Sequence, residues 1–200
     1  MCKSIKNNFY EKLTFQKLIE AHDRAKQGKM KKTGVLKFEL DLETNIMNLY
    51  RAIKDGKYKM GKYREFTIYE PKERVIKVLP YIDRVVHQWY IEDFIKPFIL
   101  KRFIQDTYAC IDGRGTHKAI ENVQKYMRIM RRKYGDYYVL KCDIKKYFYS
   151  IDKDILYNIL KRNISDKKLL ELTKIFIYDN DSKVGVPIKI ILVSFSLIFI

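Results

Sequence analysis

The chain has 200 residues, with 41 Lys and Arg against 24 Asp and Glu, which gives a formal net charge of +17. Hydrophobic residues make up 47% and aromatic residues 14%, with eight Gly and four Pro, so the composition excludes intrinsic disorder and allows a real core. The positive excess indicates an anionic partner, with nucleic acid first and a membrane surface second.

The first part of the chain predicts two helices and a β-hairpin. Apolar residues at helical spacing predict a helix over 13–27, which Gly28 ends, and a second helix over 41–54. Residues 63–80 alternate and are rich in β-branched and aromatic side chains, with a turn at 70–73. This pattern predicts two strands joined by that turn.

Two more helices are expected in the middle of the chain. Asp83 can cap a helix that runs to about Ile95, with Pro97 marking its end. The stretch 113–135 predicts a basic helix with Thr116 as its cap. Its apolar residues are expected to form a buried stripe: Ile120, Val123, Met127 and Met130.

The last third predicts a strand followed by two helices. Residues 137–143 alternate like a strand, and Asp143 closes it. A helix then opens at Asp152 or Lys153, and another covers 165–178. Mixed helices and short strands in segregated order predict an α+β fold.

Cysteine and histidine residues give no sign of a metal centre or a disulfide frame. The three cysteines lack CxxC spacing and are expected to be reduced thiols in a cytoplasmic protein: Cys2, Cys110 and Cys142. The three histidines are isolated in the sequence and are expected to pack or cap: His22, His87 and His117. The N-terminal residues contain no apolar signal region, so a secretory signal is not expected.

Asp143 is the candidate for chemistry. An acid at the carboxyl end of a strand, followed by a turn, is well placed to hold a divalent cation, because Mg²⁺ prefers hard oxygen ligands. The alternative is an ordinary Asp that caps the next turn. Three lysines flank this acid: Lys141, Lys145 and Lys146.

Four segments carry family-like motifs. In chain order they are FTIYEPKERVIKVLPYIDRVVHQWYIEDFIKPFI, TYACIDGRGTHKAI, KCDIKKYFYSID and KVGVPI. Over roughly residues 10–188, they resemble the fingers and the first half of the palm of reverse transcriptases of the bacterial group II intron and retron type. The resemblance implies a partial right-hand polymerase fold.

The resemblance also divides the chain into four parts. Residues 1–55 would form an N-terminal helical segment, 56–135 a fingers-like region and 136–187 the start of the palm. Residues 188–200 form an aberrant apolar tail with one Lys. Thirteen residues are too few for a membrane-spanning helix, which needs about 20.

Metal and nucleotide ligands are implied by the same resemblance. Asp143 matches the first metal-binding carboxylate, and the backbone carbonyl of Ile144 would be a further ligand of two Mg²⁺ ions. Phe148 matches the aromatic gate beneath the sugar of the incoming dNTP, with Tyr147 as the other candidate. Core packing is the alternative for both rings.

The resemblance places nucleic-acid and triphosphate contacts elsewhere. Lys72 and Arg74 match the basic pair that grips the triphosphate, and a solvated turn is the alternative. The turn beside nucleotide and template would comprise Gly185, Val186 and Pro187. The expected nucleic-acid contacts are Arg114, Gly115, Lys118, Arg128, Arg131 and Arg132; for any single lysine, a solvated face is the simpler interpretation.

One motif of the family is missing. The two further carboxylates belong to a Tyr-x-Asp-Asp hairpin, which the sequence does not contain. Asp179 and Asp181 stand before Gly185, in the wrong order and context to replace it. One set of allowed codons for 189–200, read in another frame, encodes the Thr-Ser-Gln and Phe-Ala-Asn of the usual continuation, so we expect a frameshifted tail.

The resemblance therefore implies an RNA-directed DNA polymerase that adds dNTP to a DNA primer on an RNA template, with two Mg²⁺ ions. This chain alone is expected to bind nucleic acid without polymerising. The alternative is a non-catalytic RNA-binding or ribonucleoprotein scaffold. A third hypothesis is a basic protein that uses its apolar tail at a membrane surface, although no membrane partner is expected.

Overall fold

The computed structural model describes residues 4–5, 8–71, 73–109, 111–179 and 182–186. Its strands are β1 (Arg64–Ile68) and β2 (Arg74–Val78). Its helices are α1 (Phe9–Lys12), α2 (Phe15–Lys26), α3 (Thr33–Glu39), α4 (Leu42–Lys54), α5 (Tyr81–Tyr90), the π-helix η1 (Ile91–Ile95), α6 (Lys96–Ile99), the 3₁₀-helix η2 (Leu100–Arg102), α7 (Thr116–Tyr134), α8 (Tyr147–Ser150), α9 (Lys153–Asn163) and α10 (Lys167–Ile177).

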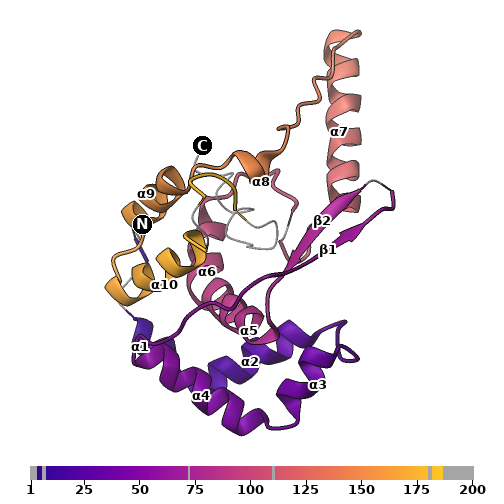
Figure 1. Cartoon of the computed structure of the whole chain (residues 1–200). Helices are drawn as coiled ribbons and strands as arrows, with labels where there is room; N and C mark the ends of the chain where they lie inside the picture. Colours follow the sequence, from indigo (N-terminus) through magenta and orange to yellow (C-terminus); the bar gives the residue numbers. More distant parts are fainter. Residues whose placement is uncertain (1–3, 6–7, 72, 110, 180–181, 187–200) are drawn as a thin grey trace.

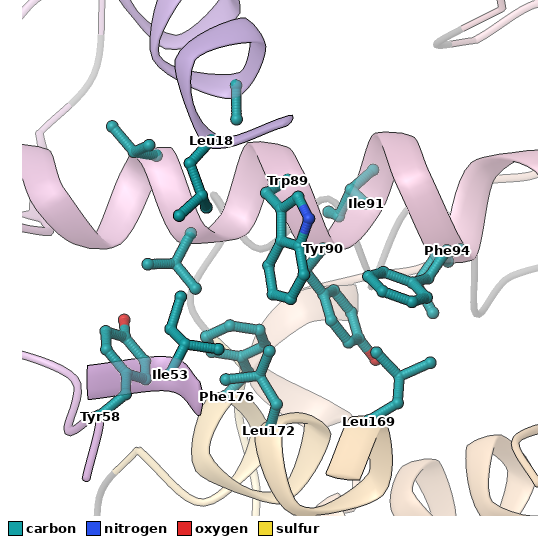
Figure 2. Close-up of a cluster of buried hydrophobic side chains, with 14 of the residues drawn as sticks. Leu18, Ile53, Tyr58, Trp89, Tyr90, Ile91, Phe94, Leu169, Leu172 and Phe176 are labelled. Carbon is teal, nitrogen blue, oxygen red and sulfur yellow. The ribbon is translucent and has the colours of Figure 1, made fainter. Parts of the chain in front are cut away.

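The core surrounds α5 and η1. Trp89 and Tyr90 are fully buried there, and their polar atoms are satisfied: Trp89 Nε1 donates to the Lys12 carbonyl at 2.9 Å, and the Tyr90 and Thr173 hydroxyls lie 2.5 Å apart. Helices from both ends of the chain supply the remaining side chains (Figure 2): Leu18, Ile53, Leu169, Leu172 and Phe176. Residues more than a hundred positions apart thus share one core.

Two N-terminal helices confirm the predictions over 13–27 and 41–54. Thr14 caps α2 by accepting a hydrogen bond from the Lys17 amide, and Gly28 follows the helix with a φ of +67°. α4 buries Ile46, Leu49 and Ile53, the face that the spacing predicted. These helices lie below α5 in Figure 1.

The predicted hairpin over 63–80 is confirmed. β1 and β2 pair antiparallel, with Arg64 opposite Val78 and Ile68 opposite Arg74. Figure 1 shows the hairpin extending away from the helical body. It is the one sheet of the described residues, so the α+β fold is dominated by helices.

The predicted limits of the central helix are wrong. α5 begins at Tyr81 with Pro80 as its N-cap residue, and Asp83 does not cap it. The Asp83 carboxylate is buried and accepts hydrogen bonds from the Tyr58 hydroxyl at 2.6 Å and the Gly61 amide at 3.0 Å. Pro97 lies in the first turn of α6 instead of ending a helix, because the first turn needs no amide donor.

α7 exists as predicted, but its apolar stripe is not buried. Gly115, not Thr116, occupies the N-cap position. Ile120 and Val123 are each 50% exposed, and Met127 and Met130 are about as exposed, at 40% and 39%. No residue of α7 is buried, because no described element covers this face of the helix.

The strand predicted over 137–143 is absent from the described residues. That segment pairs with no other strand, and Tyr138 and Leu140 project into solvent. A strand needs a partner for its amides and carbonyls. The palm sheet is therefore not formed by the described part of the chain, and Asp143 does not end a strand.

The C-terminal helices begin with side-chain caps. Asp152 caps α9 by accepting a hydrogen bond from the Ile155 amide at 2.9 Å, which confirms the prediction that a helix opens at Asp152 or Lys153. α10 begins at Lys167 with Asp166 as its cap, so the predicted start at Ser165 is two residues early. Asp166 also accepts from the Phe9 amide at 2.9 Å, which joins α10 to the N-terminal helices.

His22 and His87 pack in the core as expected, whereas the prediction for His117 is wrong, because this residue is exposed in the first turn of α7 and does not cap it. The His22 ring stacks on Phe38, and the His87 ring meets Phe176 edge-on. Among the residues that the structure describes, no helix is both long and apolar enough to cross a membrane. The apolar tail from residue 188 lies outside the described residues.

Removing the Phe176 ring should destabilise the protein strongly, because the ring contacts Tyr58, His87 and Tyr90 in the core. Phe176→Ala is expected to lower the free energy of unfolding by about 3–5 kcal/mol. The control Val123→Ala, on the exposed stripe of α7, should change it by less than about 0.5 kcal/mol. Urea unfolding of both variants measures this, and a large loss for Val123→Ala would contradict the exposed position of α7.

Acid should destabilise the protein through His87. Burial lowers the pKa of His87 to about 4, while the unfolded chain titrates near 6.5. As the pH falls below 6.5, His87 is protonated in the unfolded state but stays neutral in the folded core. The free energy of unfolding should therefore fall by about 3 kcal/mol from pH 6.5 to pH 4.

Urea unfolding across this pH range should show a shallower loss for His87→Leu. The loss will not vanish, because burial also lowers the pKa of His22. An unchanged slope would mean that the His87 ring is not held neutral in the core.

Candidate nucleic-acid interface

The turn at residues 184–186 is hydrogen-bonded to residues 148–152, a segment that contains the predicted gate residue Phe148. The Val186 amide donates to the Phe148 carbonyl, and the Gly185 amide donates to the Ile151 carbonyl, both at 2.9 Å. An antiparallel bridge pairs Asp152 with Val184. The structure thus brings together two segments that the resemblance assigned to one nucleotide pocket, although they are more than thirty residues apart.

The geometry of this junction depends on one glycine and two aromatic rings. Gly185 has a φ of +90°, a conformation that residues with a Cβ rarely adopt. The rings of Tyr147 and Phe148 meet edge-on, with centroids 5.4 Å apart, and both pack partly against the core. Gate and core packing therefore remain alternatives for these rings. Pro187 lies outside the described residues.

Asp143 precedes this junction in an exposed, extended segment. Lys146, between Asp143 and α8, takes the left-handed conformation with a φ of 51°, which turns the chain into α8. Within the described residues, the Asp143 carboxylate forms no hydrogen bond or ion pair. Ile144 is also exposed, at 57%.

The residues around Asp143 do not fit two Mg²⁺ ions. A two-metal site needs several carboxylates that share the ions, and the described residues contain no group of three or more His, Cys, Asp or Glu side chains that could hold a metal. Asp179, one of the two acids that stand before Gly185, is buried in an ion pair with Lys153. Among the described residues, Asp143 therefore has no partner carboxylates with which to share two metal ions.

The predicted triphosphate grip lies at the hairpin. Arg74 begins β2, and Lys72 lies outside the described residues. Their pairing with a triphosphate stays a prediction.

α7 carries the largest run of exposed cations. Six of its nineteen residues are Lys or Arg and one is Glu. Lys118 pairs with Glu121 at 3.4 Å, whereas Arg128, Arg131 and Arg132 are exposed and form no ion pair with a described residue. Figure 1 shows α7 standing clear of the helical body, where the hairpin also extends.

Of the other predicted contacts, Arg114 serves the loop before α7. Its guanidinium donates to the carbonyls of Gln105 and Thr107, at 2.8 and 3.0 Å. Gly115 is the N-cap residue of α7. Both residues therefore shape the start of the helix, and direct contact of either with nucleic acid stays a prediction.

Asp106, which was not among the predicted site residues, anchors α7. Its carboxylate accepts hydrogen bonds from the Tyr108 hydroxyl at 2.6 Å and the Tyr126 hydroxyl at 3.0 Å. The Asn122 amide donates to the Tyr108 hydroxyl at 2.5 Å. This set holds α7 to the preceding loop, and no motif or spacing in the sequence marks it.

A second missed feature is the buried ion pair between Lys153 and Asp179. Lys153 Nζ lies 2.8 Å from Asp179 Oδ1, and both side chains are buried. Burial, followed by the charge of Asp179, raises the pKa of Tyr63, whose hydroxyl is also buried. No local signal predicts such a pair, because its members are 26 positions apart.

Comparisons with known proteins show likeness at the level of fold. No protein-family model and no curated protein sequence matches the chain. Two solved structures are similar to it, a "Partial Cas6-RT-Cas1--Cas2 complex" and a "Cas6-RT-Cas1--Cas2 complex", each with a TM-score of 0.55 and 18% identity over 93% of this chain.

This chain spans 33% and 20% of the length of those two chains, respectively. The likeness is one of fold alone.

Proposed function

We propose that the chain is a nucleic-acid-binding segment of the reverse-transcriptase type, comprising fingers and the first part of a palm. The observation that carries the proposal is α7, an exposed helix that contains six Lys or Arg residues and one Glu. Such a surface binds the phosphate backbone strongly and without sequence preference. The fold likeness and the hydrogen-bonded junction between Phe148 and Val186 support the polymerase type.

The proposed ligand is a primer–template with an RNA template and a DNA primer. RNA would be recognised through its backbone, 2′-hydroxyls and A-form shape. The incoming dNTP would approach the junction between α8 and the 183–186 turn, with Lys72 and Arg74 at its triphosphate. In the complete enzyme, two Mg²⁺ ions would supply the chemistry, with Asp143 as one ligand.

The second candidate is a non-catalytic RNA-binding scaffold. It is favoured by the absence of a three-carboxylate group in the described residues. Both candidates require binding of nucleic acid, so binding tests them together and polymerisation separates them.

Binding to a fluorescent RNA–DNA primer–template should weaken steeply with salt, because cations on the protein release counterions from the phosphates. Replacing Arg128, Arg131 and Arg132 with Gln should reduce the magnitude of the slope of log affinity against log salt by about 2–3. Fluorescence anisotropy at several salt concentrations measures both.

A matched control removes three charges from the other end of the molecule. Lys29, Lys31 and Lys32 are exposed residues between α2 and α3, and their replacement with Gln should leave the slope nearly unchanged. Equal losses in the two triple variants would show that net charge, not α7, determines binding.

The chain should not extend a primer. With Mg²⁺ or Mn²⁺, labelled dNTP on an RNA template should remain unincorporated, because the ligands for two metals are not assembled around Asp143. An active reverse transcriptase in the same buffer is the positive control. Primer extension by this chain, abolished by Asp143→Asn, would overturn the non-catalytic assignment.

A further inference from the structure

The ion pair of Lys153 and Asp179 lies where three parts of the fold meet. Lys153 is the first residue of α9, and Asp179 stands two residues beyond the end of α10. The exposed fractions of their side chains are 1% and 0%. Of the ion pairs between described residues, it alone has both side chains buried to this extent.

Burial makes the pair sensitive to the loss of either charge. A charge in the protein interior loses its hydration, and only a close partner compensates for it. Every other described ion pair has a partner that water reaches, such as Lys168 and Glu171 on α10, whose side chains are 40% and 62% exposed. Breaking the buried pair should therefore have a far larger local effect than breaking an exposed one.

The same lysine also holds the backbone of the turn. The Lys153 amide donates to the Lys183 carbonyl at 3.0 Å. The hydrogen bonds of Gly185 to Ile151 and of Val186 to Phe148 follow directly along the chain. Lys153 thus binds the segment after α10 twice, through its side chain at Asp179 and through its amide at Lys183.

The charge of Asp179 also acts on the base of the hairpin. Tyr63 immediately precedes β1, and its buried hydroxyl lies near enough to Asp179 for that charge to raise the pKa of Tyr63, in addition to the effect of burial. The start of α9 and the segment after α10 therefore meet at the ion pair.

We infer that Lys153 and Asp179 are positioning residues that hold the Val184–Val186 turn against Phe148. The inference rests on the proposed function for its consequence, since this turn would contact nucleotide and template. The pair itself touches neither ligand. It acts by keeping the amides of Gly185 and Val186 in register with α8.

Amide hydrogen exchange of the full chain tests this directly. Asp179→Asn keeps the shape of the side chain and removes its charge. We expect the amides of Gly185 and Val186 to exchange roughly tenfold faster or more, while amides of α5 keep their protection. Asp179→Glu, which retains a carboxylate, should restore most of the protection, whereas the control Lys168→Met should leave both amides unchanged.

Two outcomes would overturn the inference. Unchanged exchange at Gly185 and Val186 would show that the turn is held without the pair. Equal acceleration in α5 would show that Asp179 supports the whole core instead of the turn.

Should Asp179→Asn fail to fold, native-state exchange of the unaltered chain in low denaturant replaces it. The amides of Lys153, Gly185 and Val186 should then open together, with one opening free energy. If Lys153 stays protected while the two turn amides exchange freely, the inference is wrong.

These measurements are independent of nucleic acid. If nucleic-acid binding does not depend on salt but the amides exchange as expected, the proposed function is refuted and the positioning role stands. If binding depends on salt as expected but the exchange of Gly185 and Val186 is unchanged in Asp179→Asn, only the positioning role is refuted.

Discussion

Burial of most of α5 and η1 is the constraint on which the rest of the structure depends. A helix with a wide apolar face needs neighbouring elements that cover that face. α2 and α4 cover it from the N-terminal part of the chain, and α10 covers it from the C-terminal part. The polar atoms of Trp89, Tyr90 and Asp83 are hydrogen-bonded within this core. Closing the core therefore requires residues on both sides of the hairpin and α7.

This closure also determines where the candidate site forms. Because α10 must pack on α5, the segment after α10 returns to the start of α9, where Lys153 binds it. The turn at Gly185 then lies against α8 as a consequence of core packing. The junction is thus supported by the packed core, whereas α7 and residues 136–146 extend beyond it, and Asp106 holds α7 only to the loop before it.

Local signals predicted most of the helices, because their causes are local. The Thr14 and Asp152 side chains cap helices through amides three residues away, and Gly28 ends one. The same reasoning failed for Asp83 and for the apolar stripe of α7, because burial there depends on distant residues. The Tyr58 hydroxyl donates a hydrogen bond to the Asp83 carboxylate, and no described element covers the stripe.

The prediction of a strand over 137–143 was wrong for a related reason. Alternation indicates a strand, but a strand forms only where a partner supplies hydrogen bonds. At the candidate site, the family-like motifs named Phe148 and Gly185, which the structure brings together. Lys153 and Asp179 could not be found in this way, because neither spacing nor residue type links them.

The distribution of ion pairs explains why the excess charge gathers at one end. Cations of the N-terminal helices have acidic partners: Asp93 of η1 lies close to Lys17 and Arg24, and Glu39 lies close to Lys26. On α7, Lys118 alone has a described acidic partner, Glu121. The remaining cations of the helix repel one another across its surface, at a cost that water and salt only partly screen.

A polyanion removes that repulsion more effectively than dilute salt does, because its phosphates stay close to the cations after their counterions are released. Ion pairs balance many cations of the body and leave α7 strongly positive, and the exposure of its residues leaves the helix accessible. The positive charge and the exposure of α7 together favour a ligand with closely spaced negative charges.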